Sequence, residues 1–155
     1  MVVIVVGAIA YVSYTAVIRS SFSITSIETA VARTATQAAY SELVTATDTF
    51  KAQTQACSAK SGPSELSCLE QADHAWAGAI MTYGSALSGI TYPSSAQFEA
   101  NAAQAAATQA SAVVNSLANS SDGQSYSTAS QSPGFRSALN AVDSTYNALI
   151  GALNG

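Results

Sequence analysis

Apolar and polar residues divide the chain into an uncharged opening segment and a longer region of amphipathic helices. Residues 1–18 carry no charged side chain, and Arg19 ends this run. A helix of this length rises roughly 27 Å, close to the roughly 30 Å hydrocarbon core of a bilayer. Because a helix that is apolar on every face needs apolar surroundings on every side, the segment predicts a membrane span. The residues expected to lie in the bilayer are Val2, Val3, Ile4, Val5, Val6, Ile9, Val12, Val17 and Ile18.

Behind this segment, apolar residues recur at three- and four-residue spacing, which is the period of amphipathic helices. Turn residues interrupt the pattern at residues 60–63 and at Tyr92-Pro93, and the polar stretch 120–131 is predicted to be a loop. No glycine or proline lies between Arg19 and Cys57, so the first helix is expected to continue the opening segment without a break. The four predicted helices cover residues 23–56, 65–90, 94–119 and 133–153.

The sequence also predicts how two of these helices begin and which face the third buries. Ser94 followed by Gln97 fits a capping box, and Ser132 before Pro133 supplies an N-cap with proline at the first helical position. The third helix has a mostly alanine stripe, which buries little area, so we expect it to be the least stable. The stripe consists of Phe98, Ala102, Ala106, Ala110, Val113 and Leu117.

The fold class follows from the helices, their short connections and two cysteines. Short connections favour antiparallel neighbours. Cys57 and Cys68 lie on either side of the turn at residues 60–63, so a disulfide would staple the hairpin between the first two helices. The prediction is an all-α protein, with an N-terminal transmembrane helix (residues 1–19) followed by an up-down four-helix bundle with one disulfide (residues 20–155).

Composition and charge narrow the range of partners. Charged residues make up 9% of the chain, against a usual share of about 25%. The net charge is −4, and the five Lys and Arg residues are scattered rather than gathered into a basic stripe. Nucleic-acid binding is therefore not expected, because it requires such a stripe. The expected partners are the lipid bilayer and either an unknown protein or a second copy of this chain.

No catalytic or cofactor motif stands out, and we predict that the chain is not an enzyme and carries no cofactor. His74 is the only histidine, Glu70 lies four positions before it, and Asp73 is adjacent. The Glu70–His74 pair is interpreted as a surface i,i+4 contact, since one histidine cannot supply the repeated motifs of di-metal bundles. A metal site or a general acid–base pair formed by the same residues is the weaker hypothesis.

Aromatic residues give the one candidate pocket. Trp76 and Tyr83 of the second predicted bundle helix, with Phe135 and Tyr146 of the fourth, could line a small apolar pocket, although simple core packing is the commoner role of such residues. Tyr92 and Tyr126 lie in predicted loops and are expected to be exposed, as part of a partner-binding surface.

The sequence gives conflicting indications of the side of the membrane on which the C-terminal domain lies. Arg19 and Arg33 follow the predicted span, which by the positive-inside rule favours a cytoplasmic C-terminal domain. The cysteine pair and the weakly charged surface favour an external one. A start upstream of Met1, bringing a short basic segment, would reconcile the two, and we expect the C-terminal domain to lie outside the cytoplasm.

The opening segment resembles the N-terminal helix of type IV pilins and pseudopilins. The resemblance consists of Met1-Val2-Val3-Ile4, then Gly7, then Ala8-Ile9-Ala10. It implies a filament subunit whose apolar helix forms the filament core. The Phe-Thr-Leu-Ile-Glu stretch and cleaved leader of that family do not precede Met1 here, and the antiparallel sheet common in its head domain has no counterpart in the predicted helices.

Three functional hypotheses follow. The favoured one is a membrane-anchored extracytoplasmic helical domain with a structural or protein-interaction role in the cell envelope. The first alternative is a pilin-like filament subunit. The second is a secreted ligand-binding bundle whose N-terminal segment is cleaved.

Overall fold

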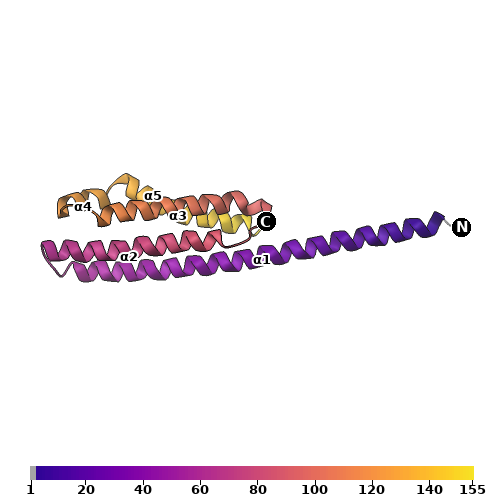
Figure 1. The fold of residues 1–155 in the computed structure, drawn as a ribbon, viewed down its shortest axis with the longest axis horizontal. Coiled ribbons are helices and arrows are strands. Elements are labelled where there is room, and N and C mark those ends of the chain that lie inside the picture. The colour runs from indigo at the N-terminus through magenta and orange to yellow at the C-terminus, as the bar shows by residue number, and fades with distance from the viewer. Residues whose placement is uncertain (1–2) are drawn as a thin grey trace.

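In the part of the chain that it describes, the computed structural model consists of helices joined by short connections and has no strand. It describes the backbone of residues 3–155 and the side chains of residues 26–155. Four long helices form the bundle, and two short ones lie in its connections (Figure 1). The elements are α1 (Val3–Cys57), α2 (Pro63–Ser88), η1 (Ser94–Ala96), α3 (Gln97–Ala118), α4 (Gly123–Ser130) and α5 (Pro133–Ala152).

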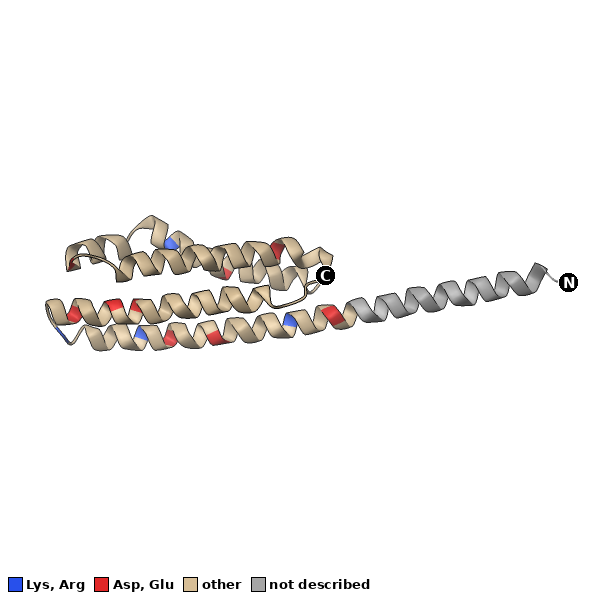
Figure 2. Cartoon of the chain, viewed as in Figure 1, with Lys and Arg blue, Asp and Glu red and all other residues tan. Residues whose placement is uncertain are grey.

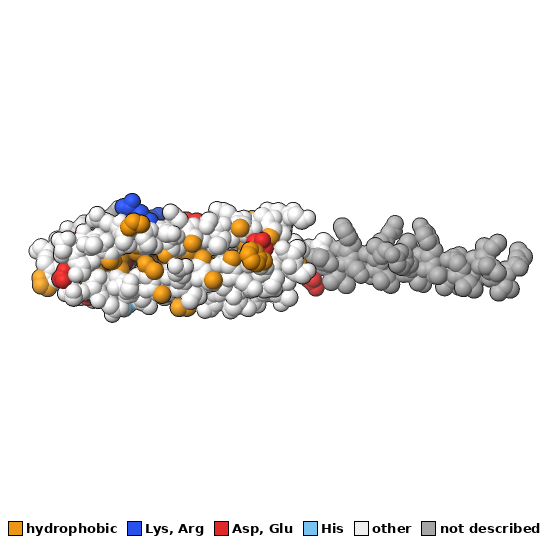
Figure 3. All heavy atoms as spheres, turned by 90° about the horizontal axis from the view of Figure 1, so that it is seen from above, with side chains coloured by type: hydrophobic (Ala, Val, Ile, Leu, Met, Phe, Trp, Pro, Cys, Tyr) orange, Lys and Arg blue, Asp and Glu red, His pale blue; other side chains and the backbone are white. Residues whose placement is uncertain are grey.

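The long helices alternate in direction, so the bundle is of the predicted up-down kind (Figure 1). α2 packs against α1 and α3, and α3 packs against α5, whereas the backbones of α1 and α5 approach each other at few points. The helix α1 is continuous over the range where no glycine or proline interrupts the sequence. Few charged residues occur along the helices (Figure 2), and the face that carries α3, α4 and α5 is mostly polar with scattered apolar side chains (Figure 3).

The centre of the bundle is built from small residues on α3. Its alanines lie against α2 closely enough that a Cβ added at Gly84 would stand 3.1 Å from the Cβ of Ala107. Close approach of this kind requires small side chains on both helices. The buried residues of α3 are Ala100, Ala103, Ala106, Ala107, Ala110, Ser111, Val114, Leu117 and Ala118.

The predicted buried face of the third helix was partly wrong. Phe98 is 79% exposed, and Ala102 and Val113 are half-buried. Ala103, Ala107 and Val114 are buried instead. α3 packs against α2 on one side and α5 on the other, so its buried surface is broader than a single stripe. Alanine occurs on nearly every face of this helix, and the sequence pattern therefore gave no sharp direction.

Two local predictions about helix starts had different outcomes. Ser132 accepts a hydrogen bond from the backbone N–H of Phe135 at 3.1 Å, which confirms the predicted N-cap of α5. The capping box at Ser94 was wrong, because Pro93 precedes the short helix η1 and no side-chain cap is made there. η1 leads directly into α3, so the backbone winds through Ser94 without needing its hydroxyl as a cap.

The loop predicted over residues 120–131 contains a short helix, α4. Asp122 caps it by accepting a hydrogen bond from the N–H of Ser125 at 2.8 Å. An aspartate at this position satisfies one of the N–H groups that a helix start leaves unpaired. α4 buries no residue fully, so it lacks the apolar stripe that would have predicted it.

The predicted disulfide is present between Cys57 at the end of α1 and Cys68 in the first turns of α2, with their Cα atoms 5.5 Å apart. It ties the two helices across the turn at Gly62, whose φ of 61° lies in the left-handed region that favours glycine. Gly62 is also the N-cap residue of α2, and Pro63 follows it at the first helical position.

Within the portion that the structure describes, no helix combines the length and apolar character needed to cross a membrane. The side chains predicted to lie in the bilayer, from Val2 to Ile18, fall outside the described residues.

Candidate binding groove between α1, α2 and α5

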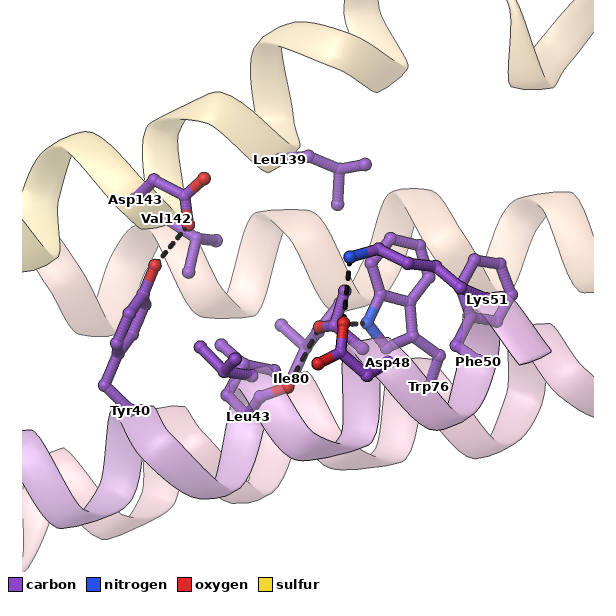
Figure 4. A pocket seen from close by; sticks show the side chains of 12 residues that line it. Tyr40, Leu43, Asp48, Phe50, Lys51, Trp76, Ile80, Leu139, Val142 and Asp143 are labelled. Carbon is purple, nitrogen blue, oxygen red and sulfur yellow. Dashed lines mark hydrogen bonds and ion pairs between the residues drawn. The ribbon is translucent and has the colours of Figure 1, made fainter. Parts of the chain in front are cut away.

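The backbones of α1 and α5 approach each other at few points, so the two helices leave a groove between them, with α2 beneath. Its cavity volume is about 410 Å³, within the usual range for small-molecule sites. Figure 4 shows its lining side chains converging from the three helices. They are Tyr40, Leu43, Val44, Thr47, Asp48, Phe50 and Lys51 of α1, Trp76 and Ile80 of α2, and Leu139, Val142 and Asp143 of α5.

An aromatic pair forms one end of the groove. Phe50 and Trp76 stack with ring centroids 4.2 Å apart and an interplanar angle of 12°. The indole Nε1–H donates to the hydroxyl of Thr47 at 3.1 Å, and that hydroxyl donates to the carbonyl of Leu43 at 2.9 Å. The indole is thus fixed by a hydrogen bond on its polar edge and by stacking on its face, which makes this end rigid.

A tyrosine cluster forms the other end. The Tyr40 hydroxyl donates to Oδ1 of Asp143 at 2.7 Å, which joins α1 to α5 across the groove (Figure 4). The ring of Tyr40 stacks on Tyr146 at a centroid distance of 3.7 Å and meets the edge of Tyr83 at 5.9 Å. Burial, followed by the hydrogen bond to Asp143, raises the pKa of Tyr40 to about 12. Tyr40 is therefore a neutral donor at every physiological pH.

The floor of the groove is apolar and its rim is charged. Leu43, Ile80 and Val142 are nearly inaccessible to water. At the rim, Nζ of Lys51 lies 2.9 Å from Oδ1 of Asp48, and both side chains are about two-thirds exposed. Such an exposed pair contributes little to stability. The pairing nevertheless largely neutralises Lys51, the only cationic side chain that lines the groove.

Of the four aromatic residues predicted to line a pocket, the structure places only one in this groove. Trp76 lines this groove, whereas Tyr83, Phe135 and Tyr146 do not. Tyr83 is buried below it, with burial the main reason that its pKa is raised. Phe135 is half-buried against the core, and Tyr146 stacks on Tyr40. The prediction missed Tyr40 and Phe50, because it placed the pocket between the second and fourth predicted helices, and both residues lie on α1.

The remaining sequence candidates have structural partners of their own. Nδ1 of His74 lies 3.1 Å from Oδ1 of Asn115 on α3, so its partner is not the predicted Glu70. No cluster of three metal-donor side chains occurs among the residues that the structure describes. Tyr92, predicted to be exposed, is buried, and its hydroxyl lies 3.0 Å from that of Thr36. Tyr126, also predicted to be exposed, is half-buried on α4.

Asp73, which the sequence offered only as a neighbour of His74, is a buried carboxylic acid in the bundle core. It is fully buried, and the Tyr126 hydroxyl of α4 is the polar group that faces its carboxyl group, although neither oxygen is within hydrogen-bond distance of a partner among the described residues. The other buried polar residues, Thr36 and Ser111, both donate to backbone carbonyls. Burial raises the pKa of Asp73 to about 6, against the lowering influence of the Tyr126 hydroxyl and of His74. Its position beside Ala72 in the apolar stripe of α2 was the available signal.

Comparisons of the chain with known protein families, with curated proteins and with solved structures found no match. The functional reading therefore rests on the residues and geometry described above.

Proposed function

We propose that this chain is a single-pass membrane protein whose helical bundle has a structural or protein-interaction role outside the cytoplasm. The observation that carries the proposal is the continuity of α1 (Val3–Cys57), which joins the uncharged opening run to the bundle without a loop. A continuous helix transmits position and orientation, whereas a flexible linker does not. In this proposal, residues 1–19 are the anchor and residues 20–155 are the bundle domain.

The disulfide supports a location of the bundle outside the cytoplasm. Structural disulfides persist in oxidising compartments and are rare in the cytosol. The Cys57–Cys68 bond lies at one end of the bundle beside the exposed turn at residues 58–62, and Cys57 itself is buried. An oxidising compartment outside the cytosol therefore fits this bond better than the cytosol does.

The test combines membrane extraction with thiol labelling. Membranes from cells that make the full chain are washed with alkaline carbonate, and intact cells are treated with a membrane-impermeant maleimide with and without reductant. We expect the chain to stay in the membrane pellet and to be labelled only after reduction. The double variant Cys57→Ser/Cys68→Ser is the labelling control. Release by carbonate contradicts the anchor, and labelling without reductant contradicts the oxidised state on which the external location depends.

A pilin-like filament subunit remains a second candidate, favoured by one observation. Ile27 and Val31 on α1 are 60% and 64% exposed, one helical turn apart. Large apolar side chains on one exposed helix face mark a surface suited to another helix. Upstream genomic sequence discriminates: a short leader ending in glycine, followed by a Phe-…-Glu segment, supports the filament subunit, and a lysine- or arginine-rich stretch contradicts it.

The third candidate, a secreted ligand-binding bundle, is favoured by the groove between α1, α2 and α5. It requires removal of the N-terminal segment. Mass spectrometry of the mature N-terminus tests it: a product that starts near Tyr11 supports secretion, and an intact opening segment contradicts it.

A further inference from the structure

The groove between α1, α2 and α5 is closed at both ends by side chains. The hydrogen bond from Tyr40 to Asp143 bounds one end, and the Phe50–Trp76 stack bounds the other (Figure 4). Residues 40 to 50 of a helix span roughly 15 Å. A site of this length with closed ends fits a small molecule, because a docked helix needs a groove that continues in both directions.

The charges of the lining favour a cation. Asp48, Asp143 and Lys51 are the acidic and basic side chains of the lining, and their formal charges sum to −1 within a chain of net charge −4. Lys51 is paired with Asp48, so Asp143 carries the charge that no basic side chain in the lining balances. Only Oδ1 of Asp143 receives the Tyr40 hydroxyl, and the second oxygen is directed away from Tyr40 (Figure 4).

The rest of the lining favours an apolar group on the same ligand. Leu43, Ile80 and Val142 form a dry floor, and Leu139 projects from α5 toward α1 and α2 (Figure 4). The aromatic edge provided by Trp76 and Phe50 adds a surface that attracts both rings and cations. Apolar contacts thus supply burial, while the carboxylate supplies orientation.

We propose that this groove binds a small organic cation bearing an aromatic group, with the ring between Trp76 and Leu139 and the ammonium beside Asp143. The inference does not depend on the membrane anchor, since all of the lining residues belong to the bundle. The membrane proposal and this one can therefore fail separately.

The experiment uses the full chain in the presence of phosphatidylcholine vesicles and follows tryptophan fluorescence. Trp76 is the only tryptophan, so its emission reports on the groove directly. The probes are benzyltrimethylammonium, neutral benzyl alcohol and anionic benzoate, each titrated with vesicles alone as the blank. We expect saturable binding in which the cation is at least about threefold tighter than the neutral probe, with the difference falling as salt rises. Benzoate is expected to bind most weakly.

Two variants separate charge recognition from general structure. Asp143→Asn keeps an acceptor for Tyr40 and removes the charge, so it should bring the cation down to the affinity of benzyl alcohol without changing benzyl alcohol binding. Glu42→Gln removes the same charge from an exposed position of α1 outside the groove and should change neither. Equal binding of all three probes, or equal losses in both variants, overturns the proposal. So does the absence of saturable binding by the unaltered chain, or a loss of benzyl alcohol binding in Asp143→Asn.

Discussion

Asp73 shows how a single residue can set the pH dependence of this bundle. Its pKa of about 6 lies above the ordinary value of about 3.9, because burial disfavours the charged form. The folded state therefore holds the proton more tightly than the unfolded chain. The stability that this provides is full below about pH 4 and is lost as pH rises through about 6.

We expect Asp73→Asn to raise the free energy of unfolding at pH 8 and to change it little at pH 4. The gain at pH 8 should be at most about 3 kcal/mol, since each pKa unit corresponds to ~1.4 kcal/mol. Urea unfolding at both pH values measures it, with Glu42→Gln as the control for loss of one charge. A gain of the same size at both pH values would mean that Asp73 does not titrate as described.

At the scale of the element, α2 contains a matched pair of glycines that tests how closely it packs on α3. A Cβ at Gly78 meets nothing within 4 Å, whereas one at Gly84 meets Ala107 at 3.1 Å. Alanine favours a helix over glycine by up to ~1 kcal/mol. We expect Gly78→Ala to stabilise the bundle by about this amount and Gly84→Ala to gain clearly less or to destabilise it. Thermal unfolding by circular dichroism measures both, and equal gains would show that the helices have room to spare.

Individual helices differ in how far the sequence could predict them. α1, α2 and α5 have large apolar residues at helical spacing and clear breakers between them, so their existence and approximate ends followed from the pattern. The buried face of α3 did not, because alanine surrounds the helix. Of the residues that line the groove, the sequence predicted only Trp76 as a pocket residue. Tyr40 and Phe50 line it because α1 and α5 are separated there, and that separation depends on how the four helices assemble.

At the scale of the whole molecule, the disulfide limits how the bundle can unfold. Removing it as Cys57→Ser/Cys68→Ser should lower the free energy of unfolding by up to about 3 kcal/mol, because the unfolded chain regains the freedom of a closed loop. Chemical denaturation of the variant, compared with the reduced unaltered protein, measures the effect. Unchanged stability in both would show that α1 and α2 are held together by packing alone.

The C-terminus lies near the point where the bundle begins on α1. Asn154 accepts a hydrogen bond from Arg33 at 2.9 Å, and the first buried residue described on α1 is Ala32. The turn at residues 58–62 lies at the opposite end of the bundle (Figure 1). A fluorescent protein fused after Gly155 would consequently lie close to α1 and obstruct any partner that binds α1 before the bundle begins. An epitope inserted at Ser61 would instead lie at the opposite tip of the bundle. Fusions for imaging or pull-down should carry their label at that tip.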